Sequence, residues 1–239
     1  MEKEATKYLV NARALKTKKL AKILQFFPFI RCVILNGSLA EGRAKKGSDI
    51  DILIVAQSGR VFSVRFFIAV LTSILGIKRS SNGTKNHAGK FCFNYYLTDD
   101  YLEIPHDRTD IINAYCARNY SQSILVWGDE NIFSEYCQVN IDWMQKYLKS
   151  QGINNKSINI FPIVENWVTK QFPIGNIRAK RVGQWWERRL SNKFGDWIEI
   201  QVKKFQIWLI EKDYRTWKYP NFVVYNDREL RFHPPKNRS

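Results

Sequence analysis

One stretch decides the fold: residues 33–55 read VILNGSLAEGRAKKGSDIDILIV. Two short apolar runs rich in β-branched residues, 30–35 and 50–55, enclose a polar segment that begins at the turn residue Gly37. Short apolar runs bounded by turn residues predict buried β-strands. We therefore expect a strand, a short helix over 38–43, a loop and a second strand.

The segments on either side predict a mixed sheet flanked by helices. An amphipathic helix over 4–27 ends at Pro28, and an apolar helix over 61–75 follows the second strand. The aromatic run 91–97 predicts a third strand, after a polar, basic loop over 78–90. Strands that alternate with helices in this way predict a core of α/β character.

The chain changes character after Pro105. The remaining sequence predicts helices, the last of them basic and rich in tryptophan, with Gly183 and Gly195 as candidate breaks. We therefore expect an α+β protein, with a mixed-sheet core over residues 1–110 and a mainly helical, basic region over residues 111–239. The expected helices of the second part cover 110–120, 131–150 and 176–213.

Asp49 and Asp51 carry most of the chemical information. They lie two residues apart at the start of the second strand, so both side chains point to the same face. Two carboxylates among apolar neighbours are costly unless a cation compensates their charge. Mg²⁺ takes oxygen ligands, typically one or two carboxylates plus substrate phosphates. The spacing therefore predicts catalytic metal ligands for Mg²⁺, or for Mn²⁺ in its place.

The turn that precedes the two aspartates suits a phosphate group. Gly37 at a strand-to-helix turn lets the backbone approach a ligand closely, and Ser38 adds a hydroxyl donor. Lys46 and Ser48 in the following loop are further candidates for nucleotide binding. A Gly-Ser turn and a D-x-D pair are each weak signals. Their combination next to two apolar strands is much stronger.

These residues form a pattern, G-S-x-A-x-G followed by S-D-I-D and an apolar run, that resembles the DNA polymerase β-type nucleotidyltransferase superfamily. The similarity to its minimal bacterial and archaeal members is close over residues 31–56. The resemblance implies that Gly37 and Ser38 contact a nucleoside triphosphate such as ATP. It also implies that Asp49 and Asp51 bind Mg²⁺ while a nucleoside monophosphate passes to an acceptor hydroxyl. The acceptor stays open among RNA ends, proteins and small molecules.

One position departs from the family's pattern. Many active members place a third carboxylate on the next core strand, and the central polar residue of that strand here is Asn94. An asparagine carbonyl can ligate a metal ion but cannot act as a general base. Two carboxylates suffice, or a carboxylate from beyond the strand completes the site, or the fold is a degenerate module that binds nucleic acid or a partner protein. The candidates for the third carboxylate are Asp99, Asp100 and Glu103.

The net charge of +16 favours a polyanionic partner, such as a nucleotide or nucleic acid. Residues 1–110 and 151–239 carry net charges of +8 and +9. Aromatic side chains in the second region either stack on bases or pack in the core, and at helical spacing we expect most of them in the core. The tryptophans concerned are Trp185, Trp186, Trp197, Trp208 and Trp217.

Cysteine usage and hydropathy favour the cytoplasm. The four cysteines are widely spaced and form no C-x-x-C pair, so neither a disulfide framework nor a zinc site is expected. The charged N-terminal residues do not resemble a secretory signal, and the most apolar stretch, 61–75, is too short to span a bilayer. We expect a soluble protein with no membrane partner.

Overall fold

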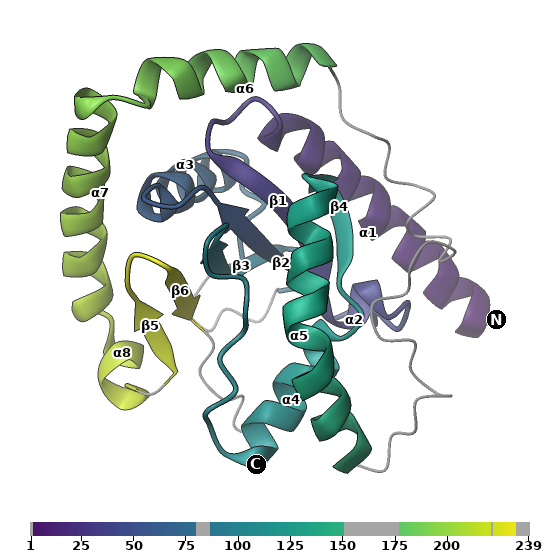
Figure 1. The fold of residues 1–239 in the computed structure, drawn as a ribbon. Coiled ribbons are helices and arrows are strands. Elements are labelled where there is room, and N and C mark those ends of the chain that lie inside the picture. Colours follow the sequence, from purple (N-terminus) through teal and green to yellow (C-terminus); the bar gives the residue numbers. More distant parts are fainter. Residues whose placement is uncertain (1, 80–86, 151–176, 221, 233–239) are drawn as a thin grey trace.

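A six-stranded mixed sheet forms the centre of the protein, in the order β4-β1-β2-β3-β6-β5 (Figure 1). The computed structural model describes residues 2–79, 87–150, 177–220 and 222–232. Strand β1 pairs antiparallel with β2 and β4, β2 pairs parallel with β3, and β6 pairs antiparallel with β3 and β5. The strands are β1 (Ile30–Asn36), β2 (Ile50–Ala56), β3 (Phe91–Thr98), β4 (Ile124–Gly128), β5 (Val223–Tyr225) and β6 (Glu229–Phe232).

The helices bear out the predicted α+β class. Helix α2, one turn long, leads from β1 toward β2, and α3 provides the crossover that lets β2 and β3 run parallel. None of the helices in the described parts of the chain is both long and apolar enough to cross a membrane. The helices are α1 (Glu2–Leu24), α2 (Gly37–Ala40), α3 (Val61–Ile74), α4 (Asp110–Tyr120), α5 (Glu130–Ser150), α6 (Ile177–Leu190), α7 (Lys193–Glu211) and α8 (Tyr214–Lys218).

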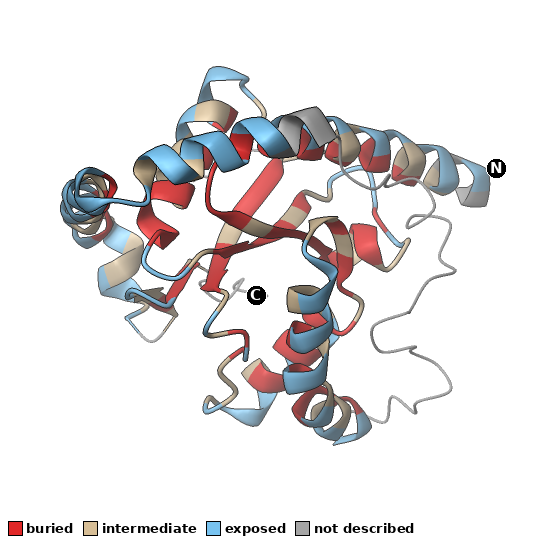
Figure 2. Cartoon of the chain, turned by 45° about the horizontal axis from the view of Figure 1, so that its top comes forward, coloured by how far each residue is buried: buried red, intermediate tan, exposed pale blue. Residues whose placement is uncertain are grey.

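The strands are buried between two layers of helices (Figure 2). Their side chains alternate between the two faces of the sheet, and each face packs in a separate apolar core. Ile52 and Ile54 of β2 pack in the core shared with α1 and α3. Leu53 and Val55 face the opposite core, which contains residues of α4 and α5. The two-residue period places Asp51 on this second face, at the start of β2.

The C-terminal part of the chain differs from the prediction in three ways. The long basic helix breaks just after α6, where the Asn192 side chain accepts hydrogen bonds from the first turn of α7, so Gly183 and Gly195 both lie within helices. Strand β4 and the β5–β6 hairpin were not predicted. They come from the part after residue 110, so both halves of the chain build the sheet. The division at residue 110 stays a prediction.

The tryptophans of α6, α7 and α8 are not core residues, and the expectation that most of them are is wrong. Their exposed fractions range from 45% for Trp186 to 78% for Trp217. Helical spacing predicts that such residues share a face, but it does not reveal whether that face turns inward. The exposed tryptophans are Trp185, Trp186, Trp197, Trp208 and Trp217.

Candidate active site

The two predicted aspartates converge where β2 and β3 begin. Asp49 immediately precedes β2 and Asp51 is its second residue, so the two carboxylates share one face of the strand. The parallel register places Cys92 of β3 beside Asp51. A carboxylate oxygen of each aspartate and the Cys92 sulfur all lie within 4.8 Å of one another. This spacing suits a single cation held between them.

Cys92, not Asn94, occupies the register position opposite Asp51. The pairing of β2 with β3 shifts by one residue between Asp51 and Leu53, which leaves an extra residue on β3 next to Asn94. The Asn94 amide donates a hydrogen bond to the Cys92 sulfur at 2.6 Å. The bulge interrupts the two-residue alternation of side chains along β3. Asn94 remains a predicted metal ligand that lies next to the cluster.

The surroundings of Cys92 raise the pKa of its thiol. Its side chain is buried, and desolvation raises its pKa well above the usual value for a thiol. The negative charges of Asp51 and Asp49 raise the pKa further, and Arg79 opposes them. A bound divalent cation would favour the thiolate for the same electrostatic reason.

Arg79 is a site residue that the sequence did not reveal. Its guanidinium forms an ion pair with Asp49 and lies 3.7 Å from the Cys92 sulfur. The Arg79 guanidinium therefore balances the negative charge of Asp49. A charged hydrogen bond of this kind also suits a phosphate oxygen. Because Arg79 is 30 residues from Asp49 in sequence, no local motif marks it.

Gly37 has a left-handed backbone and touches the carboxylate cluster. Its φ is +67°, and a Cβ atom there would lie 2.5 Å from an Asp51 carboxylate oxygen and 3.2 Å from the Asn119 side chain. Both the backbone conformation and the close approach require glycine. Ser38 follows within α2. The Gly37 backbone therefore lies directly beside the Asp51 carboxylate.

Hydrogen bonds from side chains to backbone groups hold the loop between α2 and β2 in place. Arg13 of α1 donates to the carbonyl oxygens of Lys45 and Lys46 at 2.8 and 2.7 Å. Ser48 accepts a hydrogen bond from the Lys45 amide at 3.0 Å, so its hydroxyl helps to shape the loop. The Lys46 side chain is exposed. Ser48 and Lys46 stay predicted nucleotide contacts.

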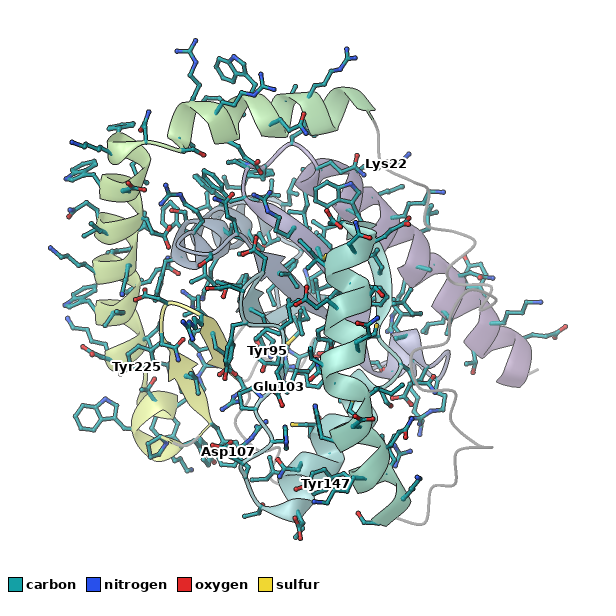
Figure 3. The ribbon with its side chains drawn as sticks, in the orientation of Figure 1. Lys22, Tyr95, Glu103, Asp107, Tyr147 and Tyr225 are labelled. Atoms are coloured by element: carbon teal, nitrogen blue, oxygen red, sulfur yellow. The ribbon has the colours of Figure 1, made fainter. Side chains whose placement is uncertain are left out.

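The three candidates for a distant third carboxylate lie elsewhere. Asp99 accepts a hydrogen bond from the Ser58 amide at 2.8 Å, and Asp100 lies 3.0 Å from the Ser58 hydroxyl. Both follow the end of β3, about 20 Å along the strand from Cys92 at roughly 3.3 Å per residue. Glu103 is on the segment between β3 and α4 (Figure 3), and its carboxylate lies 3.6 Å from the Nδ1 atom of His106.

A cavity of about 840 Å³ adjoins the cluster. Strand β6 pairs with β3 only at residues 95–97, so β6 leaves the edge of β3 beside Cys92 and Asn94 open, and both residues line the cavity. Helices α3, α4 and α8 provide further walls. Among the lining residues are one acid, Asp213, and six Lys/Arg side chains: Arg65, Lys78, Arg79, Arg108, Arg215 and Arg231.

Arg231 gives this cavity a buried positive charge. It is 6% exposed, and its Nη1 atom lies 3.0 Å from a carboxylate oxygen of Glu229, which is itself buried. Its Nε atom has no hydrogen-bond partner among the described residues. A buried guanidinium with an unused donor is costly unless an acceptor reaches it. The cavity therefore suits an anionic or oxygen-rich ligand.

A D-x-D pair at the start of a core strand, next to a Gly-Ser turn and a cationic cavity, defines a nucleotidyltransferase type of fold and site. Residues 18–114 match the family described as "Polymerase beta, Nucleotidyltransferase". This part of the chain is therefore a nucleotidyltransferase domain of the polymerase β family. It contains Gly37, Ser38, Asp49, Asp51 and Cys92, all the residues of the cluster and its turn.

Two further comparisons add no argument about function. A solved structure described as "Crystal structure of the toxin-antitoxin with AMP-PNP" aligns with 56% of this chain and 90% of that chain, at 15% identity and a TM-score of 0.32. A similarity of this size supports neither a shared activity nor a shared partner. The comparison with curated proteins finds no match.

Proposed function

We propose that this protein transfers a nucleoside monophosphate from a nucleoside triphosphate to an acceptor hydroxyl, with Mg²⁺ or Mn²⁺ as cofactor. The observation that supports this most is the convergence of Asp49, Asp51 and Cys92 within 4.8 Å beside the Gly37 turn. The donor set fits a divalent cation, because two carboxylates supply hard oxygen ligands. The Cys92 sulfur would favour Mn²⁺ over Mg²⁺ as a softer ligand.

The proposed roles follow from position. Asp49 and Asp51 hold the cation, which when bound neutralises charge on the reacting phosphates. Gly37 and Ser38 present backbone and hydroxyl donors to the triphosphate. Arg79 exchanges its contact with Asp49 for a phosphate oxygen. Together these residues orient the α-phosphate for in-line attack, and positioning of this kind supplies much of the catalysis in phosphoryl transfer.

The cavity beside β3 is the proposed location of the nucleotide and of the acceptor hydroxyl. Its cationic lining complements phosphate groups, and apolar side chains such as Ile112 and Tyr115 suit a base or a sugar. RNA ends, protein hydroxyls and small molecules are all compatible with a lining of this chemistry. We place the reaction in the cytoplasm, where nucleoside triphosphates are available and the cysteines stay reduced.

Calorimetric titration with each nucleoside triphosphate, with and without Mn²⁺ or Mg²⁺, tests the proposal. We expect metal-dependent binding of at least one nucleotide and loss of that binding in Asp49→Asn/Asp51→Asn. The matched control is Asp99→Asn/Asp100→Asn, which removes two charges at the other end of β3 and should bind normally. Nucleotides that carry an α-phosphate label then identify the acceptor by label transfer. Equal binding by both double variants would contradict the assignment.

Neither Asn94 nor Cys92, which takes the register position beside Asp51, is a carboxylate, and this favours one alternative function. In this alternative the domain has lost catalysis and uses its basic surface to bind nucleic acid or a partner protein. Burial and the charges of Asp49 and Asp51 raise the pKa of the Cys92 thiol, which disfavours the thiolate form that a general base requires. Steeply salt-dependent RNA binding, without any nucleotide or metal affinity, would support this alternative.

A further inference from the structure

The side of helix α7 that packs against the protein includes two buried polar residues, Glu199 and Gln206. Glu199 is buried and accepts hydrogen bonds from the Phe62 and Ser63 amides, both at 2.9 Å, at the first turn of α3. Gln206, also buried, donates to the Phe62 carbonyl at 2.7 Å. These contacts cap α3 and fix the rotation of α7 about its axis. The other side of α7 consequently faces away from the core.

That outer side is aromatic. Phe194, Trp197, Phe205 and Trp208 are 49–60% exposed. At 100° per residue they lie within about 80° of one another, centred roughly opposite Glu199 and Gln206, and Trp197 and Trp208 are about 16 Å apart along the axis. Helix α7 lies at the left margin of Figure 1 with no described element beyond it. Tyr214 and Trp217 of α8, 64% and 78% exposed, are the next aromatic residues along the chain.

On α6, α7 and α8 most acidic side chains have internal partners, whereas many basic side chains are exposed. Four of the five acids between residues 177 and 218 are held by internal partners: Glu187 by Phe29 and Arg31, Asp196 by Arg60, Glu199 by α3, and Asp213 by Arg215. The fifth, Glu211, is exposed. Exposed Lys and Arg side chains outnumber it. They are Arg181, Arg188, Arg189, Lys193, Lys204, Lys212 and Lys218.

The aromatic rings are arranged for apolar contact and not for base stacking. Phe194 stacks on Trp197 with centroids 6.1 Å apart, and Phe205 stacks on Trp208 at 6.2 Å. The Lys212 ammonium lies 3.8 Å from the Trp208 ring centroid. A neighbouring ring, or for Trp208 also an ammonium group, lies beside each ring, which leaves less ring surface open to a stacked base. Ile200 and Leu209, each nearly half exposed, extend the apolar surface along the flanks.

We propose that the outer face of α7 and α8 binds an anionic membrane surface. The face is defined by Phe194, Trp197, Lys204, Phe205, Trp208, Lys212 and Trp217. Exposed Trp and Phe with flanking lysines are the composition of helices that lie in the bilayer interface. The anionic lipids of the cytoplasmic leaflet complement the cations, and internal partners hold four of the five acids of these helices. Helix α7 would lie parallel to the membrane plane. This proposal is independent of the proposed transferase activity.

Flotation with lipid vesicles tests the proposal. The full chain is mixed with vesicles of phosphatidylcholine alone or with about 30% phosphatidylglycerol, the anionic lipid being needed for electrostatic attraction. We expect binding to the anionic vesicles only, and a blue shift of tryptophan fluorescence as the indole rings leave water. Trp197→Ala/Trp208→Ala should bind about tenfold more weakly, because each ring contributes buried apolar area.

Matched controls separate the face from general charge and hydrophobicity. Tyr8→Ala/Ile74→Ala removes two exposed apolar side chains from α1 and α3, each about 77–78% exposed, and should bind like the wild type. Lys204→Glu/Lys212→Glu should also lose about tenfold in affinity, from the attraction of each lysine to an anionic surface. Lys19→Glu/Lys22→Glu on α1 makes the same change in net charge and should have little effect.

Three results would overturn the proposal. One is the absence of binding to anionic vesicles at physiological ionic strength. The second is an equal loss of binding in the α1 and α7 variants, which would indicate nonspecific attraction. The third is wild-type binding of vesicles by Trp197→Ala/Trp208→Ala, with a defect instead in oligonucleotide binding or in self-association by sedimentation. Circular dichroism of each variant confirms that it is folded before binding is compared.

Discussion

The parallel strands β2 and β3 carry a pair of acidic residues near each end of the strand pair. At the start, Asp49 and Asp51 converge with Cys92, and an ion pair links Asp49 to Arg79. After the end of β3, Asp99 and Asp100 both turn toward Ser58. The first pair concentrates negative charge around a space that suits a cation. The second pair is used to close the turn that follows β2.

The difference follows from spacing and from local donors. Residues two apart at the start of an extended strand project to the same face, so the Asp49 and Asp51 carboxylates repel each other. Asp99 and Asp100 are adjacent and lie in a turn, where the Ser58 amide and hydroxyl are within reach. A pair of acids therefore indicates a metal site only when the backbone makes the two side chains converge.

The largest expected effect comes from the converging pair. Asp51→Asn keeps the size of the side chain but removes a charged ligand, and we expect turnover to fall by about 10³-fold or more, because the transition-state charge loses its main counterpart. Label transfer from the bound nucleotide measures the change, and the thermal midpoint shows that the fold is kept. Asp100→Asn is the matched variant at the other end and should stay active. Equal rates in the two variants would break the comparison.

The sequence predicted the local half of this comparison. β2 and the spacing of Asp49 and Asp51 depend on neighbouring residues, so the shared face could be derived from the two-residue period. The partner on β3 depends on register. Aligning the starts of the two strands, Ile50 with Phe91, gives Cys92 opposite Asp51, but the bulge beyond it can be seen only in the folded sheet.

Other features were missed for related reasons. Strands β4, β5 and β6 are short, between three and five residues, and β4 and β6 join the sheet through partners that are distant in sequence. Arg79 reaches Asp49 only because α3 returns the chain to the start of β3. The outward face of α7 could not be predicted, because the buried polar residues Glu199 and Gln206 help to fix the rotation of the helix.

Gly37→Ala tests whether the backbone turn beside Asp51 is needed for activity. A methyl group there would meet the Asp51 carboxylate at 2.5 Å, and the left-handed φ adds strain. We expect turnover to fall about 100-fold, because a shift of about 1 Å in a catalytic group costs that much. Gly59→Ala is the control, since Gly59 also has a positive φ, +71°, but no heavy atom lies within 4 Å of the added methyl. It should lose about 1 kcal/mol of stability and keep its activity.

Cys92→Asp tests which ligand completes the cluster. A carboxylate at this position adds a hard oxygen ligand, so Mg²⁺ affinity should rise about tenfold and the preference for Mn²⁺ should decrease. Calorimetry with both ions measures the change. Cys92→Ser, of similar size but neutral, is the control and should bind both ions more weakly than Cys92→Asp. A lower Mg²⁺ affinity in Cys92→Asp than in Cys92→Ser would show that the third position does not contact the ion.

Arg79→Gln should change metal affinity and nucleotide affinity in opposite directions. In the metal-free protein the guanidinium competes with a cation for Asp49, so its loss should raise metal affinity about threefold, since the competing ion pair is partly exposed and weak. Triphosphate affinity should fall about tenfold, the usual effect of removing one charged hydrogen bond. Arg228→Gln, an exposed arginine near the end of β3, should change neither. A parallel loss of both affinities would mean that Arg79 only supports the fold.

The smallest effect is expected at the non-catalytic pair, and it should appear in stability alone. Asp99→Ala removes the acceptor for the Ser58 amide and an ion pair with Arg31 at 3.4 Å. The ion pair is partly exposed, and Arg31 keeps Glu187 as a partner, so the cost should be about 1–2 kcal/mol and come mostly from the hydrogen bond. Urea unfolding measures this change, while nucleotide binding and turnover should match the wild type. A loss of metal affinity in Asp99→Ala would mean that the two ends of β2 and β3 are coupled, and the sites could then no longer be treated as separate.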